Sequence, residues 1–152
     1  MKAEYVNPFL EATNLVFKSM LGVEMLRGRT AVKEGPAPAY NIAIVITIKG
    51  KAAGQIIYSM NQHTAFKIAK KLMPGADEAS IRKEFRDVLG EIANMITGNA
   101  LNIFNKTAED IDLSVPMVVD TKVTKMNFKT ALTIGLNLYS PFGIVEVNIA
   151  MN

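Results

Sequence analysis

A long segment without proline, from Asp77 to about Lys106, limits the folds open to this chain more than any other part of its sequence. Asp77 is a suitable N-cap, and the rise of 1.5 Å per residue predicts a helix of about 28 residues and about 40 Å. Its apolar side chains fall on one arc at helical spacing, the arc that seeks the core; they are Phe85, Leu89, Ile92, Ile96 and Ile103. Such a helix must be central to the fold.

Shorter elements are predicted on both sides of this helix. Asn7 and Pro8, as N-cap and first-turn proline, predict a first helix that ends before Gly22. A second helix is predicted at residues 64–73, and a proline- and glycine-rich loop at residues 35–38. Runs rich in isoleucine, valine and threonine predict an antiparallel hairpin at 40–49 and 54–59, further strands at 111–119, 122–128, 131–139 and 144–151, and a mixed extended stretch at 24–32.

This order of elements predicts an α/β (α+β) fold with a single, largely antiparallel sheet covered by helices on one side. The length of 152 residues, 49% of them hydrophobic, suits one domain over residues 1–152. A helix followed by strands occurs twice, which indicates a weak internal repeat. The last strand, residues 144–151, is expected to be an exposed edge unless a second copy pairs with it.

Composition excludes several kinds of chemistry. The absence of cysteine removes disulfides and thiolates and favours a cytoplasmic location. His63 is the only histidine, so no metal site of the protein's own is expected. The longest apolar stretch, Ile42 to Ile48, is too short to cross a bilayer. The net charge of +3 gives a mild field, and the basic run from Lys67 to Lys71 is interpreted as a solvated helix face, so neither nucleic acid nor membrane insertion is expected.

A polar stripe lies opposite the apolar arc of the long helix. Asp87, Glu91 and Asn94 fall within about 60° of one another, and Gly98 follows one turn later. Glycine inside a helix costs about 0.5 to 1 kcal/mol relative to alanine, so Gly90 and Gly98 need a compensating role. The stripe is either a solvated face whose glycines pack on a neighbour, or a surface that a partner approaches closely. Spacing alone leaves both interpretations open.

The stripe also resembles a known signature. Asp87-x-x-x-Glu91-x-x-Asn94 is similar to the pattern of the CheC, CheX and FliY chemotaxis phosphatases: an acidic residue or serine, three residues, glutamate, two residues, asparagine. Further stretches that resemble CheX-like members are Thr97-Gly98-Asn99-Ala100, Gly54-Gln55-Ile56-Ile57-Tyr58-Ser59, Thr64-Ala65-Phe66-Lys67 and Val115-Pro116-Met117-Val118-Val119.

The resemblance implies a phosphatase that acts on the phospho-aspartate of a CheY-like response regulator in two-component chemotaxis signalling. It implies that Asn94 positions the hydrolytic water and that Glu91 pairs with a lysine of the receiver, while Asp87 and Gly98 serve partner binding. It further implies a homodimer and no cofactor beyond the magnesium ion of the receiver. The alternatives are a non-catalytic receiver-binding or flagellar-switch adaptor, and a structural domain in which the stripe is incidental.

Glu11 and Asn14 repeat the spacing of Glu91 and Asn94 on the first helix. The resemblance raises a second site, because CheC-type members carry two such helices. Lys18, however, stands where Gly98 stands in the long helix, and a long charged side chain at that point would obstruct docking. One active helix is therefore expected, with Glu11 and Asn14 as surface residues.

Overall fold

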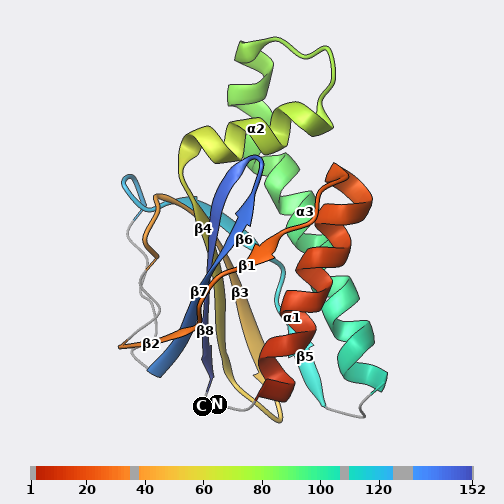
Figure 1. The fold of residues 1–152 in the computed structure, drawn as a ribbon, viewed down its shortest axis with the longest axis vertical. Helices are drawn as coiled ribbons and strands as arrows, with labels where there is room; N and C mark the ends of the chain where they lie inside the picture. The colour runs from red at the N-terminus through yellow and green to blue at the C-terminus, as the bar shows by residue number, and fades with distance from the viewer. Residues whose placement is uncertain (1–2, 35–37, 107–109, 125–131, 152) are drawn as a thin grey trace.

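The computed structural model describes residues 3–34, 38–106, 110–124 and 132–151, in which helices pack on a single sheet (Figure 1). The helical elements are α1 (Ala3–Val16), a π-helical continuation η1 (Phe17–Leu21), α2 (Gln62–Leu72) and α3 (Glu78–Lys106). The strands are β1 (Leu26–Arg27), β2 (Ala31–Glu34), β3 (Ile42–Gly50), β4 (Gly54–Met60), β5 (Ile111–Leu113), β6 (Met117–Asp120), β7 (Leu132–Ser140) and β8 (Gly143–Met151). The predicted fold class is confirmed.

Most of the predicted elements are present at the expected places. The long helix α3 spans 29 residues, and the predicted strand at 111–119 is divided into β5 and β6. Residues 35–37 of the predicted loop and residues 125–128 of the predicted strand at 122–128 lie outside the described part of the chain. Residues 122–124 belong to a turn after β6 instead of a strand, with the N–H groups of Val123 and Thr124 both donating to the Asp120 carbonyl.

The first helix differs from its prediction at the N-terminus. It begins at Ala3, so the prediction of an N-cap at Asn7 was wrong, and Pro8 lies inside the helix. Proline disturbs a helix through its missing N–H and its clash with the carbonyl four residues earlier. In α1 that carbonyl belongs to the first turn, where the disturbance can be absorbed. The helix ends, as predicted, at Gly22, whose left-handed φ of 67° lets its N–H close the last turn on Lys18.

The strands form one eight-stranded sheet in the order β1-β7-β8-β4-β3-β5, with β2 also beside β7 and β6 also beside β3. Every pair in the described part of this sheet is antiparallel. β8 therefore lies between β7 and β4, and the prediction that residues 144–151 form an exposed edge was wrong. The alternation of apolar residues along this strand indicates that one of its faces is buried, but it does not indicate which strands pair with it. The edges are β1 with β2 and β5 with β6.

The strand order divides the sheet into two equivalent halves. The β3–β4 hairpin lies beside the β7–β8 hairpin. The short strands β1 and β2 pair with β7, and the short strands β5 and β6 pair with β3, so each hairpin is extended by strands from the other half of the chain. Both edges contain the same one-residue shift in register. From Arg27 to Ala31 the chain advances four residues while its paired positions on β7 advance three. From Leu113 to Met117 the chain advances four residues while its paired positions on β3 advance three. The repeat indicated by the sequence is therefore visible in the sheet as an approximate twofold arrangement.

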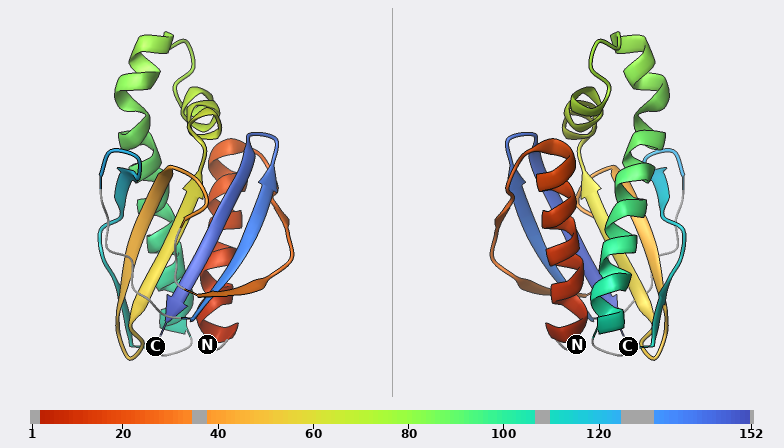
Figure 2. Two further views of the ribbon diagram at one scale, coloured as in Figure 1. Left: turned by 90° about the vertical axis from the view of Figure 1, so that its left-hand side faces the viewer. Right: turned by 90° about the vertical axis from the view of Figure 1, so that its right-hand side faces the viewer.

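The helices α1 and α3 lie side by side on one face of the sheet, and α2 lies at the end of the sheet where α3 begins (Figure 2). A single large cluster of buried apolar side chains fills the space between helices and sheet, with Phe9 of α1 and Phe104 of α3 in edge contact at 5.4 Å. A smaller cluster lies on the opposite face of the sheet, formed by Ala43, Val45, Ile57 and Val119. None of the described helices is long and apolar enough to cross a membrane.

Helix caps fix the position where α3 starts. The Asn61 side chain caps α2 by accepting the Thr64 N–H at 2.7 Å, and Asp77 caps α3 by accepting the Ser80 N–H at 2.8 Å. Hydrogen bonds from the Ser80 side chain and N–H hold the pKa of Asp77 below its usual range. Because α2 and α3 are also joined by the contact of Phe66 with Phe85, the long helix is held at its N-terminal end as well as along the sheet.

Candidate functional site

The polar stripe of α3 faces away from the sheet. Asp87, Glu91, Asn94 and Gly98 are all exposed, whereas the apolar arc of the same helix is buried in the core, except that Ile103 is only partly buried. In the part of the chain that the structure describes, none of the three polar side chains makes a hydrogen bond or an ion pair. Their carboxylate and amide groups are therefore available to a partner.

Among the described residues, no cationic side chain of α3 makes an ion pair with the two carboxylates, and this includes Lys83, which lies one turn before Asp87. Arg82 pairs with Glu78 at 3.2 Å and lies over the Phe66 ring, and Arg86 lies over the Phe85 ring at 5.8 Å. Asp87 and Glu91 thus present negative charge to the outside. A carboxylate of this kind favours a cationic group on an approaching molecule.

The turn that carries Asn94 is held by side chains as well as by the helix backbone. The Thr97 hydroxyl donates to the Asn94 carbonyl at 2.8 Å, and the Asn99 side-chain amide donates to the Met95 carbonyl at 2.8 Å. Two successive carbonyls of one turn therefore accept a second hydrogen bond. Bonds of this type can bend a helix slightly, and here they act on the turn that carries Asn94.

The two glycines of α3 have different surroundings. A Cβ atom at Gly90 would lie 4.0 Å from a methyl group of Val118, which is an ordinary packing distance. A Cβ atom at Gly98 would meet nothing within 4 Å. Packing against the described part of the chain therefore does not explain the glycine at 98.

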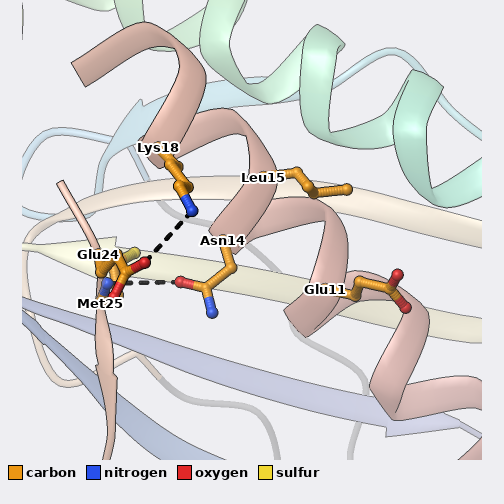
Figure 3. Close-up of a pocket in the computed structure, with 6 residues that line it drawn as sticks. All are labelled: Glu11, Asn14, Leu15, Lys18, Glu24 and Met25. Atoms are coloured by element: carbon orange, nitrogen blue, oxygen red, sulfur yellow. Dashed lines mark hydrogen bonds and ion pairs between the residues drawn. The ribbon is translucent and has the colours of Figure 1, made fainter. Parts of the chain in front are cut away.

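The corresponding face of α1 is arranged differently (Figure 3). The Asn14 side-chain oxygen accepts the Met25 N–H at 3.4 Å, and Lys18 pairs with Glu24 at 3.4 Å. These residues and Glu11 line a cavity of about 340 Å³ between the helix and the following segment. Asn14 and Lys18 are therefore engaged within the chain, in contrast to Asn94 and Gly98.

The sequence interpretation overlooked two groups near the stripe. Thr97 was considered only as part of the resemblance, although a threonine three residues after Asn94 is placed to bond its carbonyl. Met95 was not considered, although it lies outside the apolar arc of the helix and is exposed. Among the described residues, no cluster of three or more histidine, aspartate or glutamate side chains is placed to hold a metal ion.

Comparison with known proteins gives one family. The family model described as chemotaxis phosphatase CheX matches residues 42–135. The CheY-P phosphatase CheX of Thermotoga maritima is 24% identical to this chain over 141 residues, which is 92% of this chain and 91% of that protein.

Solved structures agree in fold. The chemotaxis protein CheX of Vibrio vulnificus is 26% identical with a TM-score of 0.83, and the match covers 99% of this chain and 100% of that one. CheX in the CheX–CheY–BeF3–Mg²⁺ complex of Borrelia burgdorferi is 26% identical with a TM-score of 0.75, and the match covers 97% of each chain.

Proposed function

This chain belongs to the CheX family of chemotaxis phosphatases, and from that membership we propose that it hydrolyses the aspartyl phosphate of a CheY-like receiver that docks on the exposed stripe of α3. The protein is a response-regulator phosphatase of chemotaxis. We propose that the whole chain acts as one CheX-like domain and that its substrate is the phosphorylated receiver itself.

Asn94 is the residue proposed to position the water. The water attacks phosphorus in line with the bond to the receiver's aspartate, that bond breaks, and inorganic phosphate and the free carboxylate result. An amide suits this position because its oxygen accepts a hydrogen bond from the water while its NH₂ group donates one. Phosphoryl transfer depends mainly on positioning and on electrostatic stabilisation, so one well-placed amide is a sufficient catalytic group from this chain.

Glu91 is proposed to pair with a lysine of the receiver, and Asp87 to orient the docked partner. A carboxylate close to a phosphoryl group is repelled unless a cation lies between them, so Glu91 needs that lysine. The magnesium ion is expected to belong to the receiver, which fits the fact that CheX of Borrelia burgdorferi was solved with CheY, BeF3 and Mg²⁺.

The observation that carries the proposal is the combination of unengaged polar groups with an open backbone on one helix face. Asp87, Glu91 and Asn94 have no partner among the described residues, and Gly98 beside them leaves room for a receiver to approach. The engaged Asn14 and Lys18 of α1 support a single active helix. From the family resemblance we also propose a homodimer, which must form through a surface other than β8, because β8 is not an edge strand.

The rival function is an adaptor that binds the receiver without hydrolysis. The test is the decay of a phosphorylated CheY-like receiver with and without this protein, with Asn94→Ala beside it. We expect faster decay with the wild type and its loss in Asn94→Ala, while binding of the receiver persists. Asn102→Ala, an exposed asparagine two turns further on α3, serves as the matched control and should keep full activity.

An unchanged decay rate with every cognate receiver, together with retained binding, would establish the adaptor. Absence of both binding and decay would leave α3 as a solvated face. Analytical ultracentrifugation of this protein without the receiver tests the homodimer independently, because the measured mass is then that of this chain alone.

A further inference from the structure

Two large apolar side chains are exposed on the helix layer at corresponding positions. Leu15 of α1 is 49% exposed and Met95 of α3 is 36% exposed. Each directly follows the asparagine of its Glu-x-x-Asn segment, that is, Asn14 and Asn94. Their equivalence follows from the repeat that the sheet also shows, so a common position relative to the two helices is expected.

The position is the seam between the two helices. α1 and α3 pack against each other along the same face of the sheet. Leu15 points away from the Lys18–Glu24 ion pair, on the side of α1 where α3 lies (Figure 3). The approximate twofold arrangement of the sheet predicts the corresponding side for Met95, the side of α3 that faces α1. In this arrangement the two exposed side chains form an apolar patch on the outer surface of the helix pair, which we call the seam patch, beside the stripe of Glu91 and Asn94.

The stripe alone is a poor binding surface. Stable protein interfaces cover about 800 Å² on each partner, and four positions of one helix, one of them a glycine, offer much less. The central part of an interface is depleted in charge and enriched in methionine and aromatic residues, whereas the side chains of the stripe are all polar. A receiver close enough to meet Asn94 also comes close to α1, because packed helix axes are only about 8–10 Å apart.

We infer that Leu15 and Met95 form the apolar anchor of the receiver-docking surface, so that the partner contacts both helices and not α3 alone. This inference rests on the proposed function. The receiver must then carry an apolar surface next to its phosphorylated aspartate, and Glu91 and Asn94 act at the border between that contact and the reacting group. α1 contributes to docking although Asn14 and Lys18 are engaged elsewhere.

The expected signature is a change in affinity without a change in chemistry. Leu15→Ala and Met95→Ala should each raise the concentration for half-maximal dephosphorylation about tenfold, as loss of an interface anchor does, and leave the rate at saturation unchanged. Met95→Leu preserves volume and apolar character and should restore wild-type affinity. Val32→Ala, an exposed apolar residue on the distant β2 edge, is the matched control and should change neither quantity.

Binding to a beryllofluoride-loaded receiver is measured with the same variants, so that docking is read without hydrolysis. Wild-type affinity in both alanine variants would overturn the inference and leave the proposed function intact. A wild type that binds but does not hydrolyse would refute the phosphatase proposal alone. If the two variants instead change the sedimentation mass and leave receiver affinity as it is, the seam patch joins copies of this chain and the inference is wrong.

Discussion

Gly98 and Gly90 lie two turns apart on α3. Comparing alanine substitutions at the two positions separates the effect of a helix glycine on stability from its effect on receiver docking. Gly98→Ala should raise the free energy of unfolding by about 0.5 to 1 kcal/mol, since the new methyl group meets nothing within 4 Å. The same methyl group should obstruct the receiver and reduce kcat/KM at least about tenfold. Urea denaturation and receiver dephosphorylation measure the two effects on one sample.

Gly90→Ala is the control for that experiment. It adds the same methyl group at an ordinary packing distance from Val118, so it should give a comparable gain in stability with unchanged activity. A Gly98→Ala variant that is both more stable and fully active would refute close approach at position 98.

A substitution at Asn94 can add a negative charge while the size of the side chain stays the same. Asn94→Asp keeps the size of the side chain but places a carboxylate beside the phosphoryl group, where like charges repel. We expect Asn94→Asp to lose turnover and also to bind the loaded receiver more weakly than Asn94→Ala does. Because salt screens exposed charges, the difference in affinity between the two variants should shrink as ionic strength rises. Equal affinities at low salt would place Asn94 away from the phosphoryl group.

At the scale of elements, α1 is tied to the sheet through a buried pair of hydroxyl groups. Thr13 and Tyr58 lie 2.7 Å apart, and the Thr13 hydroxyl also donates to the Phe9 carbonyl. A carbonyl can only accept, so the single proton of Thr13 is used there and Tyr58 must be the donor to Thr13. Burial raises the pKa of Tyr58 and keeps its hydroxyl protonated, so that it can donate to Thr13.

Tyr58→Phe should therefore lower the free energy of unfolding by about 1 kcal/mol, because it removes one buried hydrogen bond and leaves Thr13 without a donor. Urea denaturation measures the loss. Tyr139→Phe is the matched control, since Tyr139 is 44% exposed, and it should cost less than about 0.5 kcal/mol. Equal effects of the two substitutions would show that the Thr13–Tyr58 bond does not stabilise the packing of α1.

The elements differ in how well the sequence predicts them, and the reasons are local. α3 was predictable because its apolar arc and its Asp77 cap lie within one segment. The start of α1 was not, because the Asn7–Pro8 signal is a strong one and the structure nevertheless keeps Pro8 inside the helix. The location of residues 144–151 depends on strand pairing across the whole chain, which alternation along a single strand does not encode.

The candidate site shows the same limit. Glu91 and Asn94 could be selected from spacing and resemblance, as could the obstruction expected from Lys18. The seam patch could not, since its two members come from different halves of the chain and are related only through the packing of α1 on α3. Contacts between halves are a property of the tertiary fold.

At the scale of the whole molecule, one buried carboxylate joins an edge of the sheet to its centre. Glu146 on β8 accepts the Lys33 ammonium of β2 at 3.0 Å, the Ala39 N–H at 2.9 Å, and further bonds from the Asn148 amide and the Ser59 hydroxyl. Burial alone would raise the pKa of Glu146, but these donors together, including the positive charge of Lys33, outweigh it and lower the pKa below its ordinary value. The carboxylate thus binds the proton less readily in the folded chain than in the unfolded one.

The sign of the resulting pH dependence follows from this lowered pKa. The stabilisation by Glu146 is fully present above its unfolded pKa, near 4.5, and is lost as the pH falls through the lower folded value. Glu146→Gln removes the charge and should cost about 1.5 to 3 kcal/mol at pH 7, the range for hydrogen bonds to a charged group. It should also flatten the decline of stability below about pH 4.5, since it has no carboxylate to protonate.

Urea midpoints between pH 3 and pH 7 measure both effects. The control is Glu84→Gln, which changes an exposed carboxylate on α3 and should cost less than about 0.5 kcal/mol at pH 7. If Glu146→Gln declines in acid as steeply as the wild type, acid sensitivity arises elsewhere and the link from β2 to β8 is not its origin.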